Sequence, residues 1–311
     1  MQKKNSKKLI LTWHLAFALC LLSHVEHVNC QEKAVQENLL RRTTKTLKTI
    51  TPDLVVPILE ESKPASGKRV KVNITRFAKT DVYHTLYLPV DWRADRSRKY
   101  PVIVEYAGNG PYRSPQGDHC TGKVDDCKLG YGISGGKEFI WVCLPYISKD
   151  GTQNQLQWWG DLDATVDYCK QVVPKICEQW NGDADSVFIA GFSRGAIACN
   201  YIGLFDDEIA KLWRGFICHS YYDGVRSWSY PGSDRKSAME RLKRLRMRPQ
   251  FISHERSIEA TKQYLASTKA EGRFTFHAME FPNHTDTWAL RDVPIRRAAR
   301  RWITKTLEAS N

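Results

Sequence analysis

From residue 100 onward, short and almost wholly apolar runs alternate with stretches whose apolar residues recur at helical spacing. Residues 100–107 and 139–145 are continuous apolar runs, which are typical of strands buried on both faces of a sheet. Residues 161–180 carry an apolar stripe at the period of a helix. The alternation continues with strands at 186–190, 215–218, 250–253 and 273–281 and with helices at 194–205, 257–270 and 292–307. This order predicts the α/β class, with a mostly parallel central sheet and helices on both of its faces.

The part of the chain before residue 100 has a different pattern. Residues 31–66 form a polar, weakly helical lead-in segment, and alternating runs at 70–77 and 82–88 predict a hairpin or meander of two strands. We therefore expect one α/β domain over residues 67–311. Residues 108–137 form a long glycine-rich insertion between two of its strands.

The first 30 residues resemble an export signal. Four lysines at positions 3, 4, 7 and 8 precede an apolar run over residues 9–22, which is the charge and length pattern of a secretory signal peptide. Trp13 and His14 interrupt the run, which is also shorter than the roughly 20 apolar residues that a membrane span needs, so we prefer a signal peptide. A retained N-terminal anchor is the alternative. We expect an exported protein, periplasmic or extracellular, that touches a membrane only through this segment.

Composition excludes several classes of protein. The 311 residues are 42% hydrophobic and 11% aromatic, which is enough to build a core and rules out general disorder. The net charge is +13, and much of the excess lies in the arginine-rich stretches 241–248 and 291–301. No nucleic-acid-binding module accompanies these stretches, so we interpret them as solvated helix faces and expect no nucleic-acid partner. A basic surface that recruits acidic polysaccharide is a further hypothesis.

The chain has nine cysteines, whose positions bear on disulfides, buried thiols and metal sites. Cys120 and Cys127 flank a loop rich in glycine and aspartate, where a short-range disulfide is expected in an oxidising compartment. Cys143, Cys199 and Cys218 lie in apolar runs and are expected to be buried free thiols. The sequence has no CxxC pair and no HExxH helix, so we expect neither a metal site nor a cofactor.

The most specific motif is Gly-Phe-Ser-Arg-Gly at residues 191–195. It follows a predicted strand directly and precedes a predicted helix, which is the context of a nucleophile elbow. A sharp turn of this kind strains the backbone of its central residue and leaves no room for side chains two positions away on either side. It would raise the hydroxyl of Ser193 above the sheet at a helix N-terminus, where negative charge is favoured.

A serine nucleophile needs a base, which in turn needs an acid to orient it. His284 follows the last predicted strand, as the order serine, acid, histidine requires. Glu255 and Asp223 each follow a strand between the serine and the histidine; we prefer Glu255 as the acid and keep Asp223 as the alternative. Asp286 is too close in sequence to His284 to reach beneath its ring, so we expect it to order the loop.

Two further groups of residues complete the predicted site. The backbone N–H of Arg194, together with donors at Gly108 and Asn109 after the strand 100–107, would stabilise an oxyanion; Asn109 could donate through its backbone or its side chain. Aromatic residues in loops on the same edge of the sheet would line a substrate cleft. These are Trp158, Trp159 and Tyr222, with Tyr221, Trp228 and Tyr230 as further candidates.

These motifs together resemble the α/β-hydrolase superfamily over about residues 69–308. The resemblance rests on the strand–GFSRG–helix turn, the Ala-Gly-Asn-Gly loop at 107–110 and the loop Pro-Asn-His-Thr-Asp-Thr-Trp at 282–288. Within the superfamily the chain is similar to secreted serine esterases of the polyhydroxybutyrate-depolymerase and feruloyl or acetylxylan esterase type, and to the catalytic domain of prolyl-oligopeptidase-like proteins. The resemblance implies Ser193 as nucleophile and His284 as base. The chain departs from the family pattern at Ala107, where a histidine often stands, and at Ser257, where the acid is usual.

The expected function is hydrolysis of carboxylic esters through an acyl-enzyme on Ser193, with a small-molecule or polysaccharide-linked ester as substrate. One alternative is a serine peptidase of the prolyl-oligopeptidase type, although 311 residues would leave no room for the propeller that selects peptides in such enzymes. The other is a non-catalytic exported binding protein on a hydrolase scaffold, because a fold does not fix a function.

Overall fold

The computed structural model describes residues 46–309, and Leu47 is the first residue of the compact unit to which the following description applies. The predicted signal segment at residues 1–30 and residues 31–45 of the predicted lead-in lie outside the described residues.

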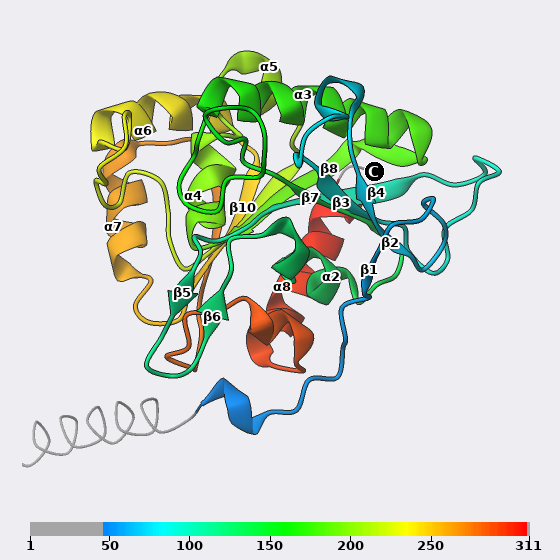
Figure 1. Cartoon of the computed structure of the whole chain (residues 1–311). Helices are drawn as coiled ribbons and strands as arrows, with labels where there is room; N and C mark the ends of the chain where they lie inside the picture. Colours follow the sequence, from blue (N-terminus) through cyan, green and yellow to red (C-terminus); the bar gives the residue numbers. More distant parts are fainter. Residues whose placement is uncertain (1–45, 310–311) are drawn as a thin grey trace, which may run out of the picture. The chain divides into compact units, whose positions relative to one another are not determined.

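The core of the unit is a nine-stranded sheet in the order β1-β2-β3-β7-β4-β8-β9-β10-β11 (Figure 1). β2 pairs antiparallel with β3, and β3 pairs antiparallel with β7, whereas all other neighbours in the sheet are parallel. The strands are β1 Leu59–Glu60, β2 Arg69–Val72, β3 His84–Tyr87, β4 Tyr100–Tyr106, β7 Ile140–Leu144, β8 Gly182–Phe192, β9 Gly215–His219, β10 Pro249–His254 and β11 Arg273–Ala278. The mostly parallel sheet and the antiparallel pair before it confirm the predicted order of strands.

Helices connect the parallel strands. The α-helices are α2 Leu129–Ser134, α3 Leu162–Gln179, α4 Arg194–Tyr201, α5 Asp207–Ala210, α6 Arg235–Leu242, α7 Glu259–Thr268 and α8 Pro294–Glu308. Short 3-10 helices lie at η1 Leu47–Thr49, η2 Thr75–Phe77, η3 Val124–Asp126, η4 Lys243–Leu245 and η5 Thr287–Leu290. Within residues 46–309, no helix combines the length and the apolar character that a membrane crossing requires.

The two faces of the sheet are covered by different helices (Figure 1). Alternate residues of each central strand belong to two separate apolar clusters: Val104 and Ile189 pack under α3 and α4, whereas Ile103 and Phe188 pack under α2 and α8. Because side chains of a strand alternate between faces, strands that are buried on both faces are apolar at almost every position, and Glu105 of β4 is the exception here. The continuous apolar runs of the sequence therefore identify the central strands correctly.

The compact unit begins earlier than predicted. Residues 47–66 were expected to belong to a polar, weakly helical lead-in, but they contain η1 and the edge strand β1, which pairs with β2. Leu47 is buried, and Asp53 accepts two hydrogen bonds from Arg296 of α8, at 2.6 and 2.5 Å. These interactions are made with residues far away along the chain, so local periodicity in 47–66 does not reveal them.

The glycine-rich insertion at 108–137 has structure of its own. It contains a two-stranded sheet of β5 Tyr112–Arg113 and β6 His119–Cys120, followed by η3 and α2. The buried carboxylate of Glu105 on β4 accepts hydrogen bonds from three consecutive backbone N–H groups, those of Lys128, Leu129 and Gly130, at 3.1, 3.1 and 2.8 Å. This carboxylate satisfies the free donors at the start of α2 and so fixes the helix against the sheet.

Candidate active site

The predicted elbow is present at the end of β8. The strand ends at Phe192, α4 begins at Arg194, and Ser193 between them has φ 56° and ψ −116°. This is a strained backbone conformation for a residue with a side chain. A Cβ atom on Gly191 would lie 2.1 Å from the carbonyl carbon of Gly195, and one on Gly195 would lie 1.9 Å from the Tyr106 oxygen. The two glycines of the motif are thus required because the turn is too tight for any side chain at either position.

His284 connects the serine to a carboxylate. Its Nε2 atom lies 3.1 Å from the Ser193 hydroxyl oxygen, and its Nδ1 atom lies 2.6 Å from Oε1 of Glu255. Ser193 follows β8, Glu255 follows β10 and His284 follows β11, so the three side chains meet at the carboxyl ends of parallel strands. Ligand and catalytic sites in open α/β sheets form at this edge.

The environment of Glu255 keeps its carboxylate ionised. Burial is the largest single influence and raises the pKa of Glu255, but the hydrogen bond with His284 and the electrostatic attraction of His219, His284 and His254 together outweigh it, and the pKa falls to about 2. Glu255 is only 8% exposed, so the carboxylate interacts with the imidazole at a low local dielectric. A permanently charged partner at Nδ1 favours the tautomer of His284 that leaves Nε2 free to accept a proton.

The structure does not bring Asp223, the alternative acid, to His284. Its two carboxylate oxygens accept hydrogen bonds from the guanidinium of Arg241, at 2.9 and 3.1 Å. Burial raises the pKa of Asp223 to about 6 in spite of this pairing. The alternative assignment is therefore wrong, because Asp223 is buried within a separate ion pair.

Aromatic rings hold the imidazole of His284 in place. Its ring centroid lies 4.7 Å from that of Phe192, 5.1 Å from that of Tyr112 and 5.6 Å from that of Tyr221. Phe192 belongs to the GFSRG motif, whereas Tyr112 comes from the insertion strand β5. Sequence reasoning missed Tyr112, since nothing local places the insertion above the catalytic edge of the sheet.

The predicted oxyanion loop lies beside Ser193. The backbone N–H of Arg194 is the first of α4, and such a donor has no partner within its helix. Asn109 lines the same cavity as Ser193. The Oδ1 atom of Asn109 accepts a hydrogen bond from the backbone N–H of Trp158, at 2.8 Å, so the side chain braces this neighbouring loop. Both routes considered for Asn109 remain, because this contact uses its Oδ1 acceptor and neither its Nδ2–H nor its backbone N–H.

A cavity of about 160 Å³ opens directly beside Ser193. Its walls include Tyr112, Trp158, Tyr221 and Trp228, together with Ile197 of α4. Of the three predicted lining residues, the structure therefore brings only Trp158 to this cavity.

The other two predicted lining residues do not line this cavity: Tyr222 is buried in the core, whereas Trp159, although also buried, lines a neighbouring cleft of about 650 Å³ together with Trp158. Tyr222 is 3% exposed and donates a hydrogen bond to Gln250, at 2.6 Å. Trp159 is 4% exposed and stacks on Tyr201 at a centroid distance of 4.6 Å. The prediction for Tyr222 is wrong because its side chain packs into the core, and in this loop Tyr221 is the residue that lines the cavity.

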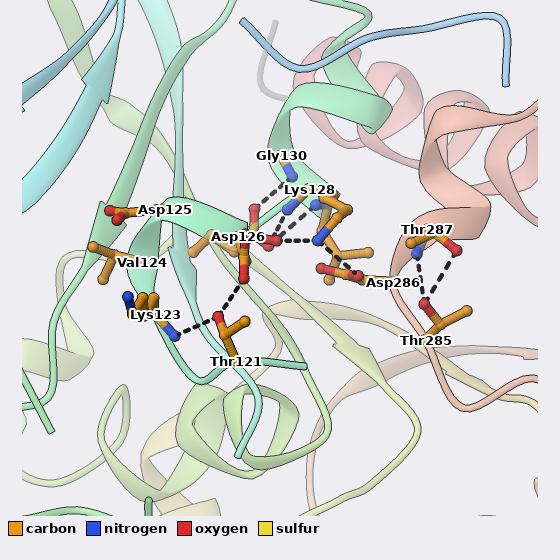
Figure 2. Close-up of polar contacts among 12 residues, drawn as sticks. Thr121, Lys123, Val124, Asp125, Asp126, Lys128, Gly130, Thr285, Asp286 and Thr287 are labelled. Carbon is orange, nitrogen blue, oxygen red and sulfur yellow. Dashed lines mark hydrogen bonds and ion pairs between the residues drawn. The ribbon is translucent and has the colours of Figure 1, made fainter. Parts of the chain in front are cut away.

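A polar network joins the insertion to the loop that carries His284 (Figure 2). The ammonium of Lys128 donates to the backbone oxygen of Asp126 and lies 3.7 Å from a carboxylate oxygen of Asp286. Asp286 is 7% exposed, and burial raises its pKa while Lys128 opposes that rise. Asp286 thus ties the His284 loop to the insertion, in the ordering role that the sequence suggested for it.

One buried group among the described residues has the donor types of a metal site. The ligand atoms of Glu105, Cys127 and Cys143 all lie within 4.8 Å of one another. However, both oxygens of Glu105 are already occupied, because they accept the three N–H groups at the start of α2 and the indole N–H of Trp141, the last at 2.8 Å. This donor set is better explained as the anchor of α2 than as a place for an ion.

The expected disulfide between Cys120 and Cys127 is wrong, because both residues are free thiols. Cys120 lines the cavity beside Ser193, whereas Cys127 is buried beside Cys143, so the two thiols have different surroundings. The expectation that Cys143, Cys199 and Cys218 are buried free thiols is confirmed.

Comparisons with known proteins agree with this architecture. No protein-family model matches the chain, and no curated protein sequence matches it. Among solved structures, a fungal esterase from Rhizomucor miehei matches with a TM-score of 0.51 and 12% identity, over 78% of this chain and 83% of the esterase. A sugar hydrolase from Lactococcus lactis matches with a TM-score of 0.51 and 13% identity, over 78% of this chain and 100% of the hydrolase.

A protein from Bacteroides ovatus described as a dipeptidyl aminopeptidase IV matches with the same TM-score of 0.51, at 13% identity. The match covers 76% of this chain but only 35% of that protein. At such low identity these likenesses establish the fold alone. The chain therefore has the α/β-hydrolase fold, with a serine, a histidine and a glutamate hydrogen-bonded in a row at its catalytic edge.

Proposed function

We propose that the chain is a serine hydrolase that cleaves carboxylic esters through an acyl-enzyme on Ser193. The observation that carries this proposal is the continuous row from Glu255 through His284 to Ser193, with contacts of 2.6 and 3.1 Å. A nucleophile, a base and an orienting acid within hydrogen-bond reach of one another are the signature of nucleophilic catalysis by serine.

The chemistry follows from the positions of the atoms. Nε2 of His284 takes the proton of Ser193 while the serine oxygen attacks the ester carbonyl. The negative charge that forms on the carbonyl oxygen is stabilised by the backbone N–H groups of Arg194 and Asn109. His284 returns its proton to the departing alcohol, and a water molecule then releases the carboxylic acid by the same two steps. Glu255 remains ionised throughout and stabilises the imidazolium.

The surroundings of the site suit an ester of a polyhydroxylated alcohol. Two wider clefts, of about 450 and 650 Å³, are both lined by Gln153, Gln155 and Gln157. Trp158 lines the second cleft as well as the small cavity. Neutral amides beside aromatic rings are suited to sugar hydroxyls, so we propose a small-molecule or polysaccharide-linked ester as the substrate. We also propose that the protein is exported and acts outside the cytoplasm.

The test is covalent labelling combined with turnover. Wild-type protein should react with a fluorophosphonate probe and hydrolyse p-nitrophenyl acetate, whereas Ser193→Ala should lose labelling and lower kcat by at least about 10⁴-fold. Ser227→Ala is the matched control, because this exposed serine lines neither the small cavity nor the two clefts and should leave both readouts unchanged. Labelling that persists in Ser193→Ala would refute the assignment of the nucleophile.

The same assay separates the alternatives. A folded wild-type protein that neither labels nor turns over any ester would favour a non-catalytic binding protein. Faster hydrolysis of peptide p-nitroanilides than of esters would favour the peptidase. This alternative corresponds to the described activity of the structurally similar Bacteroides ovatus protein.

A further inference from the structure

The side chain of Arg194 is almost completely buried beside the proposed oxyanion site. It is 1% exposed, and among residues 46–309 no carboxylate pairs with it. All its hydrogen bonds go to backbone carbonyl oxygens: Nη1 to Trp158 at 2.6 Å, Nη2 to Gly108 at 2.9 Å and to Gly122 at 3.5 Å, and Nε to Ala107 at 3.4 Å. One guanidinium therefore joins three separate loops around the cavity.

The aromatic ring of Tyr146 packs against this guanidinium. The guanidinium carbon of Arg194 lies 3.8 Å from the centroid of the Tyr146 ring, a close cation–π arrangement. The phenol of Tyr146 donates a hydrogen bond to the Ala107 oxygen at 3.0 Å, so the ring is itself fixed to the same loop. Burying a cation without a counter-charge is unfavourable, and burial lowers the pKa of Arg194. What this buried cation does provide is a fixed position for the backbone carbonyls to which it donates.

The geometry points to a role for the Arg194 side chain in positioning the oxyanion donor, and this inference rests on the proposed hydrolase function. A peptide unit is planar and trans, so its carbonyl and its N–H point in opposite directions. Because the Gly108 carbonyl is held by Arg194, the N–H of Asn109 in the same peptide unit must point away from the guanidinium. Asn109 and Ser193 line the same cavity. Arg194 thus supplies one proposed oxyanion donor from its own backbone and orients the other through its side chain.

Trp158 forms a second brace on Asn109. Its carbonyl accepts from Arg194, and its N–H donates to the Asn109 side chain at 2.8 Å. Trp158 has φ 49°, a left-handed conformation that a residue with a side chain adopts only when its surroundings enforce it. The hydrogen bonds of Arg194 to Trp158 and Gly108 and of Trp158 to Asn109 thus form a ring that the Gly108–Asn109 peptide bond closes, and this ring includes the strained backbone of Trp158.

The test compares Arg194→Met and Arg194→Lys with wild-type protein in p-nitrophenyl acetate hydrolysis. Loss of an oxyanion donor in serine hydrolases lowers kcat by about 10²–10³-fold. We expect misorientation of one donor to lower kcat by about 10- to 100-fold with KM changed by less than about 3-fold, because the ground-state carbonyl depends little on that donor. The second-order rate of fluorophosphonate labelling should fall in parallel, because its phosphoryl oxygen occupies the same site.

Arg69 provides a matched control. It is also buried, at 3% exposed, donates to the carbonyls of Val124 and Asp125, and lies 4.5 Å from the centroid of the Trp141 ring. Arg69→Met removes the same chemistry away from Ser193 and should lower the free energy of unfolding while leaving kcat within about 2-fold. Thermal melting of every variant shows which ones fold.

Each outcome decides the question. Wild-type protein without esterase activity or labelling would overturn the proposed function and this inference together. An active wild-type enzyme with a folded Arg194→Met variant of normal kcat, or with a change in KM alone, would overturn only the inference. Two Arg194 variants that both fail to fold would show that the side chain serves folding and not the orientation of the donor.

Discussion

Two buried acidic residues near the catalytic edge illustrate how the partner of a carboxylate sets its role. Glu255 faces an imidazole, and its pKa falls to about 2 in spite of burial, because the hydrogen bond with His284 and the attraction of neighbouring histidines together favour the ionised form. Asp223 faces Arg241 instead, in a buried pair whose desolvation raises its pKa to about 6. The position of the partner, and not the depth of burial, distinguishes the proposed triad acid from a structural ion pair.

Substituting each acid by its amide tests this distinction. Glu255→Gln should lower kcat by about 10³–10⁴-fold, because a neutral amide neither selects the reactive tautomer of His284 nor stabilises the imidazolium. Asp223→Asn should leave kcat within about 3-fold while lowering the free energy of unfolding, because it leaves the guanidinium of Arg241 buried without its counter-charge. Both are measured by p-nitrophenyl acetate turnover and urea unfolding at pH 7. Equal losses of kcat in the two variants would contradict the assignment of Glu255.

Some of these residues can be predicted from sequence because their signals are local. The two glycines around Ser193 follow from the tightness of one turn, and His284 follows from its place after the last strand. The choice of Tyr222 failed because the direction of a side chain in an irregular loop depends on what packs against it. The guanidinium of Arg194 was missed for the same reason, since its carbonyl partners come from three distant loops.

At the level of elements, the insertion between β4 and β7 acts as the support of the His284 loop. Its helix α2 is fixed to the sheet by Glu105, and Lys128 at the start of this helix reaches Asp286 (Figure 2). The strands and long helices were predictable from periodicity, whereas β5, β6, η3 and α2 were not. Elements of two to six residues carry too few positions for a periodic signal, and tertiary contacts alone define them.

A double-mutant cycle tests the link between the insertion and the His284 loop. Lys128→Met should lower the free energy of unfolding by about 1–3 kcal/mol, because it leaves the carboxylate of Asp286 buried without its cation. Adding Asp286→Asn should recover part of this loss, giving a coupling energy of about 1 kcal/mol in urea unfolding at pH 7.

Lys123→Met provides the control for this cycle, because Lys123 is an exposed lysine of the same loop. It should change the free energy of unfolding by less than about 0.5 kcal/mol. Strictly additive losses in the Lys128 and Asp286 variants would show that the two side chains do not interact.

For the whole molecule, two fully buried histidines connect stability to pH. Burial lowers the pKa of both His84 and His219 to about 3. In the unfolded chain a histidine takes up its proton near pH 6.5, which the folded protein resists until about pH 3. Each residue therefore contributes stability that is complete above pH 6.5 and is lost as the pH falls from 6.5 towards 3. Asp223, whose pKa is raised, acts in the opposite direction below about pH 6.

His84→Gln isolates one of these contributions. His84 hydrogen-bonds Tyr168 at 2.9 Å away from the active site, so the variant should keep its activity. The free-energy difference in unfolding between wild-type and variant should shift in favour of the variant by up to about 2 kcal/mol from pH 7 to pH 5, because glutamine does not titrate. A difference that stays constant with pH would contradict the assignment of a neutral buried imidazole.

The chamber next to Ser193, at about 160 Å³, is smaller than the usual 300–1,000 Å³ of a ligand pocket and has room for only about five groups the size of water. Its walls are largely aromatic and leave little room, so we expect selection by size before selection by polarity. We therefore expect short acyl groups to be accommodated and long fatty chains to be turned away. The larger half of an ester would then extend outward along the glutamine-lined clefts.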